Sequence, residues 1–317
     1  VDVWPFVYSF VADHFQYLAS LGLITLAAAG LATLGQRLHL TGRPIGAAAA
    51  GLLLLVLGGL TFAQGFIYRD LDTLWNDVIA KNPTNSIAYN NLATMTLNRD
   101  GRAGLDKAMG LAEQALVNDP RNHLAMNNLG SIYKALGRYE EALALFRRSI
   151  DRQKLDAGIH REVGEILLRL NRHEEALPYL RNALKLQQAR RKPTGLEETL
   201  LGVARYQLGE VDEAMGHFRA ALGQSPVPPQ AHHYLAVALA SQGKFTDALD
   251  HYQKAISDLT TAAGEDPRQA MELGLGLSDA HLNLGNLMMR LNQPQQAIEQ
   301  YRLATRHAPG EAPPRVA

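Results

Sequence analysis

Residues 127–142 decide the fold, and they read NNLGSIYKALGRYEEA. Apolar and small side chains recur at helical spacing on both sides of Gly137, a residue type that commonly ends a helix. A large residue followed by a small one, Leu129 then Gly130, lets a second helix approach closely, and Ala142 gives the second helix a small residue at the crossing point. The stretch therefore predicts a helix-turn-helix hairpin with a tightly packed interface.

The same pattern occurs about six times from residue 86 onward, with a period of about 34 residues. Each copy has a large-small pair, at Leu92-Ala93, Leu129-Gly130, Val163-Gly164, Leu201-Gly202, Leu235-Ala236 and Leu284-Gly285. Crossing alanines follow at Ala108, Ala142, Ala176, Ala214, Ala248 and Ala297, and the turn residues are Gly137, Asn171, Gly209, Gly243 and Asn292. Because such hairpins bury their apolar faces by stacking, the chain is predicted to be an all-α solenoid.

This repeated pattern resembles the tetratricopeptide-repeat (TPR) family. The resemblance implies a solenoid over residues 86–309 whose first helices line a concave groove for an extended peptide or a partner helix. Residues 70–83 look like the second helix of a half repeat, and the Pro-rich residues 310–317 are expected to be a disordered tail.

Side chains on the first helix of each repeat are the candidate binding residues. Asn91, Asn128 and Asn283 occupy the same repeat position, where an amide could bond a peptide backbone whatever its sequence; the alternative is a bond within the same repeat or to solvent. The full set predicted to face the groove is Asn91, Thr94, Asn128, Ser131, Arg161, Glu165, Tyr206, His233, Asn283, Asn286 and Arg290.

The first quarter of the chain contains two long charge-free stretches, 15–36 and 44–68. Both are long enough to cross a bilayer and lack a polar stripe, so two transmembrane helices are expected; buried helices of a soluble core are the alternative. The connector 37–43 carries arginine and no acid, which predicts that it is cytoplasmic and that the repeats are extracytoplasmic. Residues 1–14 are expected to be an interfacial or re-entrant segment, and the lipid bilayer an expected partner.

Two spans followed by repeats resemble the C-terminal part of the transmembrane-and-TPR O-mannosyltransferase family, whose membrane part is similar to a GT-C glycosyltransferase. The family's catalytic acids lie upstream, so the resemblance implies no catalytic residue here and a repeat region that recruits the acceptor. Asp13 and His14 are candidates for contact with the sugar donor, against the alternatives of a helix cap and a headgroup position. A membrane-anchored binding scaffold and the recruiting end of a glycosyltransferase both stay open.

Composition excludes several classes of function. The chain has 31 basic and 31 acidic residues, intermixed rather than clustered, so nucleic acid is not an expected partner. It has no cysteine, which excludes disulfides and thiol chemistry, and its 11 histidines lack metal-ligand spacing. No metal or cofactor site is expected. The sequence starts with Val1 rather than Met, and a fragment of a longer protein is expected.

Overall fold

The computed structural model describes residues 70–265 and 270–307, together with single positions between residues 30 and 62. The chain divides into two compact units, Val1–Lys81 and Asn82–Ala317. Within the first unit, α3 (Leu71–Lys81) is the element with defined bounds. It falls in the stretch expected to form a half repeat, and that role stays a prediction.

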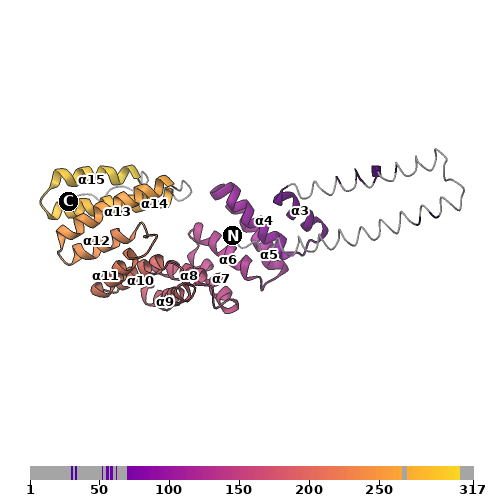
Figure 1. Cartoon of the computed structure of the whole chain (residues 1–317), viewed down its shortest axis with the longest axis horizontal. Helices are drawn as coiled ribbons and strands as arrows, with labels where there is room; N and C mark the ends of the chain where they lie inside the picture. Colours follow the sequence, from indigo (N-terminus) through magenta and orange to yellow (C-terminus); the bar gives the residue numbers. More distant parts are fainter. Residues whose placement is uncertain are drawn as a thin grey trace. The chain divides into compact units, whose positions relative to one another are not determined.

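The second unit is a series of helical hairpins (Figure 1). In every hairpin the two helices pack against each other, and the second helix packs against the first helix of the next hairpin. The pairs are α4 (Ser86–Asp100) with α5 (Leu105–Asn118), α6 (His123–Ala135) with α7 (Tyr139–Arg152), α8 (Ala157–Arg169) with α9 (His173–Ala189), α10 (Gly195–Gln207) with α11 (Val211–Leu222), α12 (Ala231–Ser241) with α13 (Phe245–Glu265), and α14 (Ala270–Arg290) with α15 (Pro294–His307). This arrangement confirms the predicted all-α solenoid.

Local sequence signals set the ends of these helices. Asn122 and Asp156 cap α6 and α8, because their side chains accept hydrogen bonds from Ala125 N at 3.1 Å and Gly158 N at 2.8 Å. The predicted turn residues all have positive φ, from 57° to 82°: Gly137, Asn171, Gly209, Gly243 and Asn292. Glycine and asparagine tolerate this conformation at a helix C-terminus, which confirms the turn assignments.

Small residues on the first helices allow the close helix crossings. A Cβ added to Gly202 would lie 2.4 Å from Phe218 Cε1, and one added to Gly164 would lie 2.3 Å from Leu180 Cδ2. The Phe218 side chain is only 1% exposed, so it fills the space that the missing Cβ leaves. The core of each repeat therefore depends on a small residue facing a large one.

Two repeats are longer than the others. Ala93 and Ala108 are 15 residues apart, three more than Gly130 and Ala142, and a short 3-10 helix, η1 (Gly101–Gly104), takes up this difference. The longer insertion before the last repeat extends α13 and α14 to 21 residues each. Leu259 of α13 and Leu277 of α14 are buried together, so the extension has its own apolar contact.

The predicted integral-membrane location, with extracytoplasmic repeats, is wrong. Among the described residues, no helix is both long and apolar enough to cross a membrane. α13 and α14 have sufficient length, but charged residues interrupt both, among them Asp250 and Lys254 on α13 and Asp279 on α14. The stretches 15–36 and 44–68, assigned to transmembrane helices, lie outside the described residues apart from single positions, as do the segments 1–14, 37–43 and 310–317.

The Gly202–Phe218 contact gives a direct test of the packing. Gly202→Ala should lower the free energy of unfolding by about 1–3 kcal/mol, because the added methyl overlaps a buried ring that cannot move away. Gly216→Ala, on the exposed side of α11 with nothing within 4 Å, should instead raise it by about 0.5–1 kcal/mol. Urea unfolding of both variants measures the difference. Equal effects from the two substitutions would contradict the role of the small residue.

Candidate functional site

The first helices of successive repeats lie next to one another and form a shared surface, here called the first-helix face. α4 contacts α6, and α8, α10, α12 and α14 contact each other in sequence. Ion pairs between α6 and α8 join the two groups. Side chains from all six helices can therefore act on a ligand that runs along this face.

A hydrogen-bonded cluster occupies the face at α4 and α6. Asn128 Nδ2 donates to Asn90 Oδ1 at 2.7 Å and to Thr94 Oγ1 at 2.8 Å. The structure thus brings the predicted residues Thr94 and Asn128 together, but it uses both amide hydrogens of Asn128 to join neighbouring repeats. The sequence left three possible partners for this amide: a bound peptide, its own repeat and solvent. The two bonds that Asn128 makes go to none of these, because they reach the neighbouring repeat.

The other two predicted residues of this region stand apart from the cluster. Asn91 Nδ2 is buried and has no hydrogen-bond partner among the described residues, so it keeps an unmet donor. Ser131 is exposed on the surface of α6.

An ionic network occupies the face at α6, α8 and α10. Lys134 Nζ lies 2.7 Å from Glu162 Oε2 and 2.6 Å from Glu165 Oε2. Arg161 Nη1 lies 3.2 Å from Glu197 Oε1, and Arg161 Nε lies 3.6 Å from Glu165 Oε1. Three carboxylates share two cations, so the predicted groove residues Arg161 and Glu165 are already paired within the protein.

Burial and charge act in opposite directions on Lys134. Burial lowers the pKa of this ammonium group, but the negative charges of Glu165 and Glu162 outweigh the burial and leave its pKa raised. Lys134 therefore stays charged at neutral pH, and the network holds α6 to α8 electrostatically.

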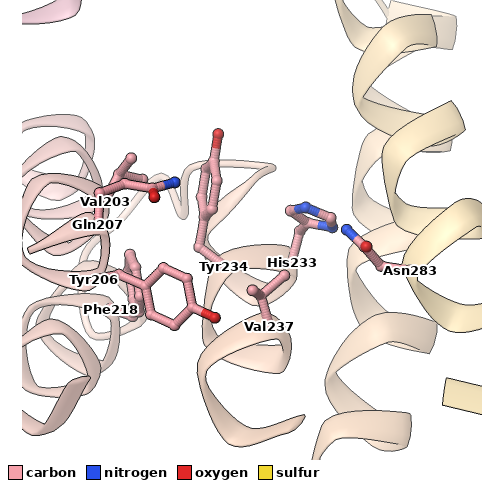
Figure 2. A pocket seen from close by; sticks show the side chains of 8 residues that line it. All are labelled: Val203, Tyr206, Gln207, Phe218, His233, Tyr234, Val237 and Asn283. Atoms are coloured by element: carbon pink, nitrogen blue, oxygen red, sulfur yellow. The ribbon is translucent and has the colours of Figure 1, made fainter. Parts of the chain in front are cut away.

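An open pocket of about 170 Å³ lies at the C-terminal part of the face (Figure 2). Val203, Tyr206 and Gln207 come from α10, Phe218 from α11, His233, Tyr234 and Val237 from α12, and Asn283 from α14. The structure thus gathers three predicted residues, Tyr206, His233 and Asn283, although they lie on three different repeats.

His233 lines this pocket from α12. Its side chain is 8% exposed, and burial lowers the pKa of the imidazole to about 4, so the ring is neutral at pH 7. The Nδ1 atom is buried without a hydrogen-bond partner among the described residues. In Figure 2 the Asn283 amide points toward this ring. Burial also raises the pKa of the neighbouring Tyr234, which keeps its hydroxyl protonated.

The remaining predicted residues do not join the pocket. Tyr301 Oη donates to Asn286 Oδ1 at 2.9 Å, so Asn286 faces the second helix of its own repeat. Arg290 is exposed at the end of α14. Asp13 and His14 lie outside the described residues, and contact with a sugar donor stays a prediction.

Sequence reasoning missed most of the pocket wall and three of the five residues of the ionic network. Val203 and Val237 each lie three residues from a lining residue on the same helix, so helical spacing around Tyr206 and Tyr234 could have found them. Glu197 carried no such signal. It lies in the first turn of α10, where an acidic residue is common because it interacts favourably with the helix dipole, so its position did not indicate a partner on another repeat. The omitted residues are Val203, Gln207, Phe218, Tyr234, Val237, Lys134, Glu162 and Glu197.

The chain has no cysteine, so its candidate metal ligands are histidine and carboxylate side chains. No group of three or more His, Asp or Glu side chains within them is arranged to hold a metal ion. His232 Nδ1 and His251 Nδ1 are 2.8 Å apart, a distance that fits a hydrogen bond between two imidazoles.

The Arg161–Glu197 pair gives a test of the network. Glu197 is 1% exposed, so Arg161→Met should leave a buried carboxylate unpaired and lower the free energy of unfolding by about 2–3 kcal/mol. Combining it with Glu197→Gln should recover most of that loss. Arg172→Met, which breaks the exposed pair with Glu175, should have little effect and is the control. Chemical unfolding measures all three, and an additive double mutant would argue against the pairing.

His233 predicts acid sensitivity. The folded-state pKa of about 4 lies below the ordinary value of 6.5, so the unfolded chain binds the proton more tightly. The free energy of unfolding should therefore fall as pH decreases from about 6.5 to about 4, and His233 contributes about 2–3 kcal/mol of that loss by pH 4.5. Urea unfolding at pH 7 and 4.5 should show a smaller difference for His233→Gln than for the natural sequence. An unchanged difference would show that His233 is not buried in its neutral form.

Comparison with known proteins identifies the family of these repeats. The tetratricopeptide repeat model matches residues 101–156, 132–193 and 199–270, which is more than half of the chain. No curated protein matches the sequence.

Several solved structures are similar to this chain. PilW, a widely conserved type IV pilus biogenesis factor, is 22% identical with a TM-score of 0.57 over 71% of this chain and 94% of PilW. A tetratricopeptide repeat protein from Parabacteroides merdae ATCC 43184 is 16% identical with a TM-score of 0.58 over 80% and 92% of the two chains. YrrB, a TPR protein with an unusual peptide-binding site, is 25% identical with a TM-score of 0.49 over 58% and 91%. From its hairpins, its turn residues and the matched model, the chain belongs to the tetratricopeptide repeat family.

Proposed function

We propose that this chain is a scaffold that binds an extended peptide, or an extended segment of a partner protein, along its first-helix face. The observation that carries the proposal is the pocket between α10, α12 and α14, which combines an apolar wall with a buried, unpaired polar atom on His233. Ligand sites on proteins typically have this character, an apolar cavity with a few convergent polar groups.

The rest of the face supports binding of an extended chain rather than of an isolated small molecule. The pocket receives residues from three successive repeats, so its mouth lies on a surface that continues over the neighbouring first helices. Toward the other end of this surface, Asn91 has a second unmet atom, its Nδ2, which is a hydrogen-bond donor. An extended peptide presents backbone carbonyl groups that such donors can bind.

The alternative function, an acceptor-recruiting region of a membrane glycosyltransferase, has no support from the comparisons. The matched model and the similar structures share the repeats with this chain. Among the described residues, no helix is able to cross a membrane. We therefore propose proteins or peptides as the partners, and not the lipid bilayer that the sequence led us to expect.

Selection from a displayed library of random peptides tests the proposal on the full chain. Enriched peptides are synthesised, and their dissociation constants are measured by fluorescence anisotropy. Val203→Arg places a long charged side chain in the pocket wall and should weaken binding at least tenfold, about 1.4 kcal/mol. Ala220→Arg makes the same kind of change on the exposed side of α11 and should leave the affinity unchanged.

Two results would contradict the proposal. A library that yields no peptide with measurable affinity would remove peptide binding as the function. Peptides that bind the natural chain and the Val203→Arg variant equally well would move the binding surface away from the first-helix face.

A further inference from the structure

We propose that the pocket between α10, α12 and α14 receives the side chain of a tyrosine residue from the bound peptide, with its hydroxyl group at His233. This inference rests on the proposed function and deepens it, because it names the side chain that the scaffold selects. It follows from the size of the pocket, the nature of its walls and the hydrogen-bonding capacity left open inside it.

The size of the pocket fits one aromatic ring. Its volume is about 170 Å³, and an apolar cavity of about 150 Å³ is known to hold a benzene molecule. A single six-membered ring with one added oxygen fills the remaining space. The fused rings of tryptophan are larger, and an aliphatic side chain of similar volume carries no group for the polar end.

The walls of the pocket favour an aromatic guest. Phe218 and Tyr234 stack with ring centroids 5.9 Å apart and an interplanar angle of 16°, and Tyr206 supplies a third ring. Aromatic pairs prefer offset-stacked or edge-to-face contacts at centroid distances of about 4.5–7 Å. A ring that enters between Tyr206 and Tyr234 can make such contacts while Val203 and Val237 cover its remaining apolar surface. Figure 2 shows these side chains gathered around the same space.

The polar end of the pocket distinguishes tyrosine from phenylalanine. His233 Nδ1 is buried and makes no hydrogen bond with any described residue, and an unmet buried polar atom is costly. A phenolic hydroxyl can donate or accept, so it satisfies this nitrogen in either tautomer of the neutral ring. The benzyl side chain of phenylalanine has no polar atom, so it would leave the buried nitrogen unpaired. A site that is built around such a group discriminates against the analogue that lacks the hydroxyl.

The charge of the pocket excludes ionised side chains. Its lining residues are aliphatic, aromatic or amide apart from His233, which burial keeps neutral at pH 7. A carboxylate, an ammonium or a phosphotyrosine would lose its hydration without gaining an opposite charge from the lining. The described geometry therefore selects the unmodified, neutral phenol.

The test uses the full chain and three blocked pentapeptides, Ac-AAYAA-NH2, its phenylalanine counterpart and its phosphotyrosine counterpart. Dissociation constants come from titrations followed by NMR, and the imidazole resonances of His233 report on contact with the ring. The tyrosine peptide should shift those resonances and bind about tenfold more tightly than the phenylalanine peptide. The phosphotyrosine peptide should bind more weakly than either. Equal affinity for all three, or a preference for the phosphorylated form, would overturn the proposal.

Two substitutions separate the hydroxyl contact from the general fit of the ring. His233→Phe keeps a ring in this position but removes its polar atoms, so it should remove the preference for tyrosine over phenylalanine while the ring still binds. Ala220→Leu, on the exposed side of α11, should leave the preference in place and is the control. If His233→Phe disturbs folding, as circular dichroism would show, His233→Leu takes its place. A preference that survives both His233 substitutions would overturn the assignment of the hydroxyl to His233.

The same measurements distinguish failure of this inference from failure of the proposed function. Library-selected peptides that bind the first-helix face with no tyrosine requirement would overturn the tyrosine pocket and leave the scaffold function intact. A tyrosine pentapeptide that binds at His233, together with a library that yields no longer ligand, would support the pocket and overturn the extended-peptide scaffold.

Discussion

The close crossing of the two helices in each repeat is the constraint on which the rest of the structure depends. Where Gly202 faces Phe218 and Gly164 faces Leu180, there is no room for even one additional carbon atom. This contact fixes the spacing and the angle inside the hairpin. Because successive hairpins repeat the same contact, their first helices come to lie side by side and present one shared face.

That face is divided into three regions with different chemistry. The Asn128 amide joins α4 to α6, and an ionic network centred on Lys134 and Arg161 joins α6, α8 and α10. Polar side chains in these two regions largely satisfy one another, so they contribute to the register between repeats. The third region is different, because the pocket around His233 combines an unmet hydrogen-bonding atom with an apolar cavity wall. Unmet capacity of this kind, rather than polarity alone, marks the place where a ligand gains most by binding.

The neutrality of the pocket connects stability with recognition. Burial that holds the pKa of His233 near 4 makes the imidazole a poor partner for ionised ligands at neutral pH and a good partner for a hydroxyl group. The same burial makes the folded state sensitive to acid, because protonation of this ring is easier in the unfolded chain. Recognition of a ligand in the pocket and the stability of the C-terminal repeats toward acid thus depend on one side chain, His233.

The sequence by itself determined the helices, their turns and the small residues at their crossings, since these follow from spacing within about 34 residues. It also gave a membrane location that is wrong for the described residues. Only the tertiary structure decided which first-helix side chains pair with each other, because Lys134 and Glu162 are 28 residues apart and meet only when repeats stack. Asn286, three residues from Asn283, turned toward its own second helix, whereas Tyr206, His233 and Asn283 converged on one pocket. The repeat pattern fixes the position of a backbone along the solenoid, but the direction, length and burial of neighbouring side chains decide which atoms are left free.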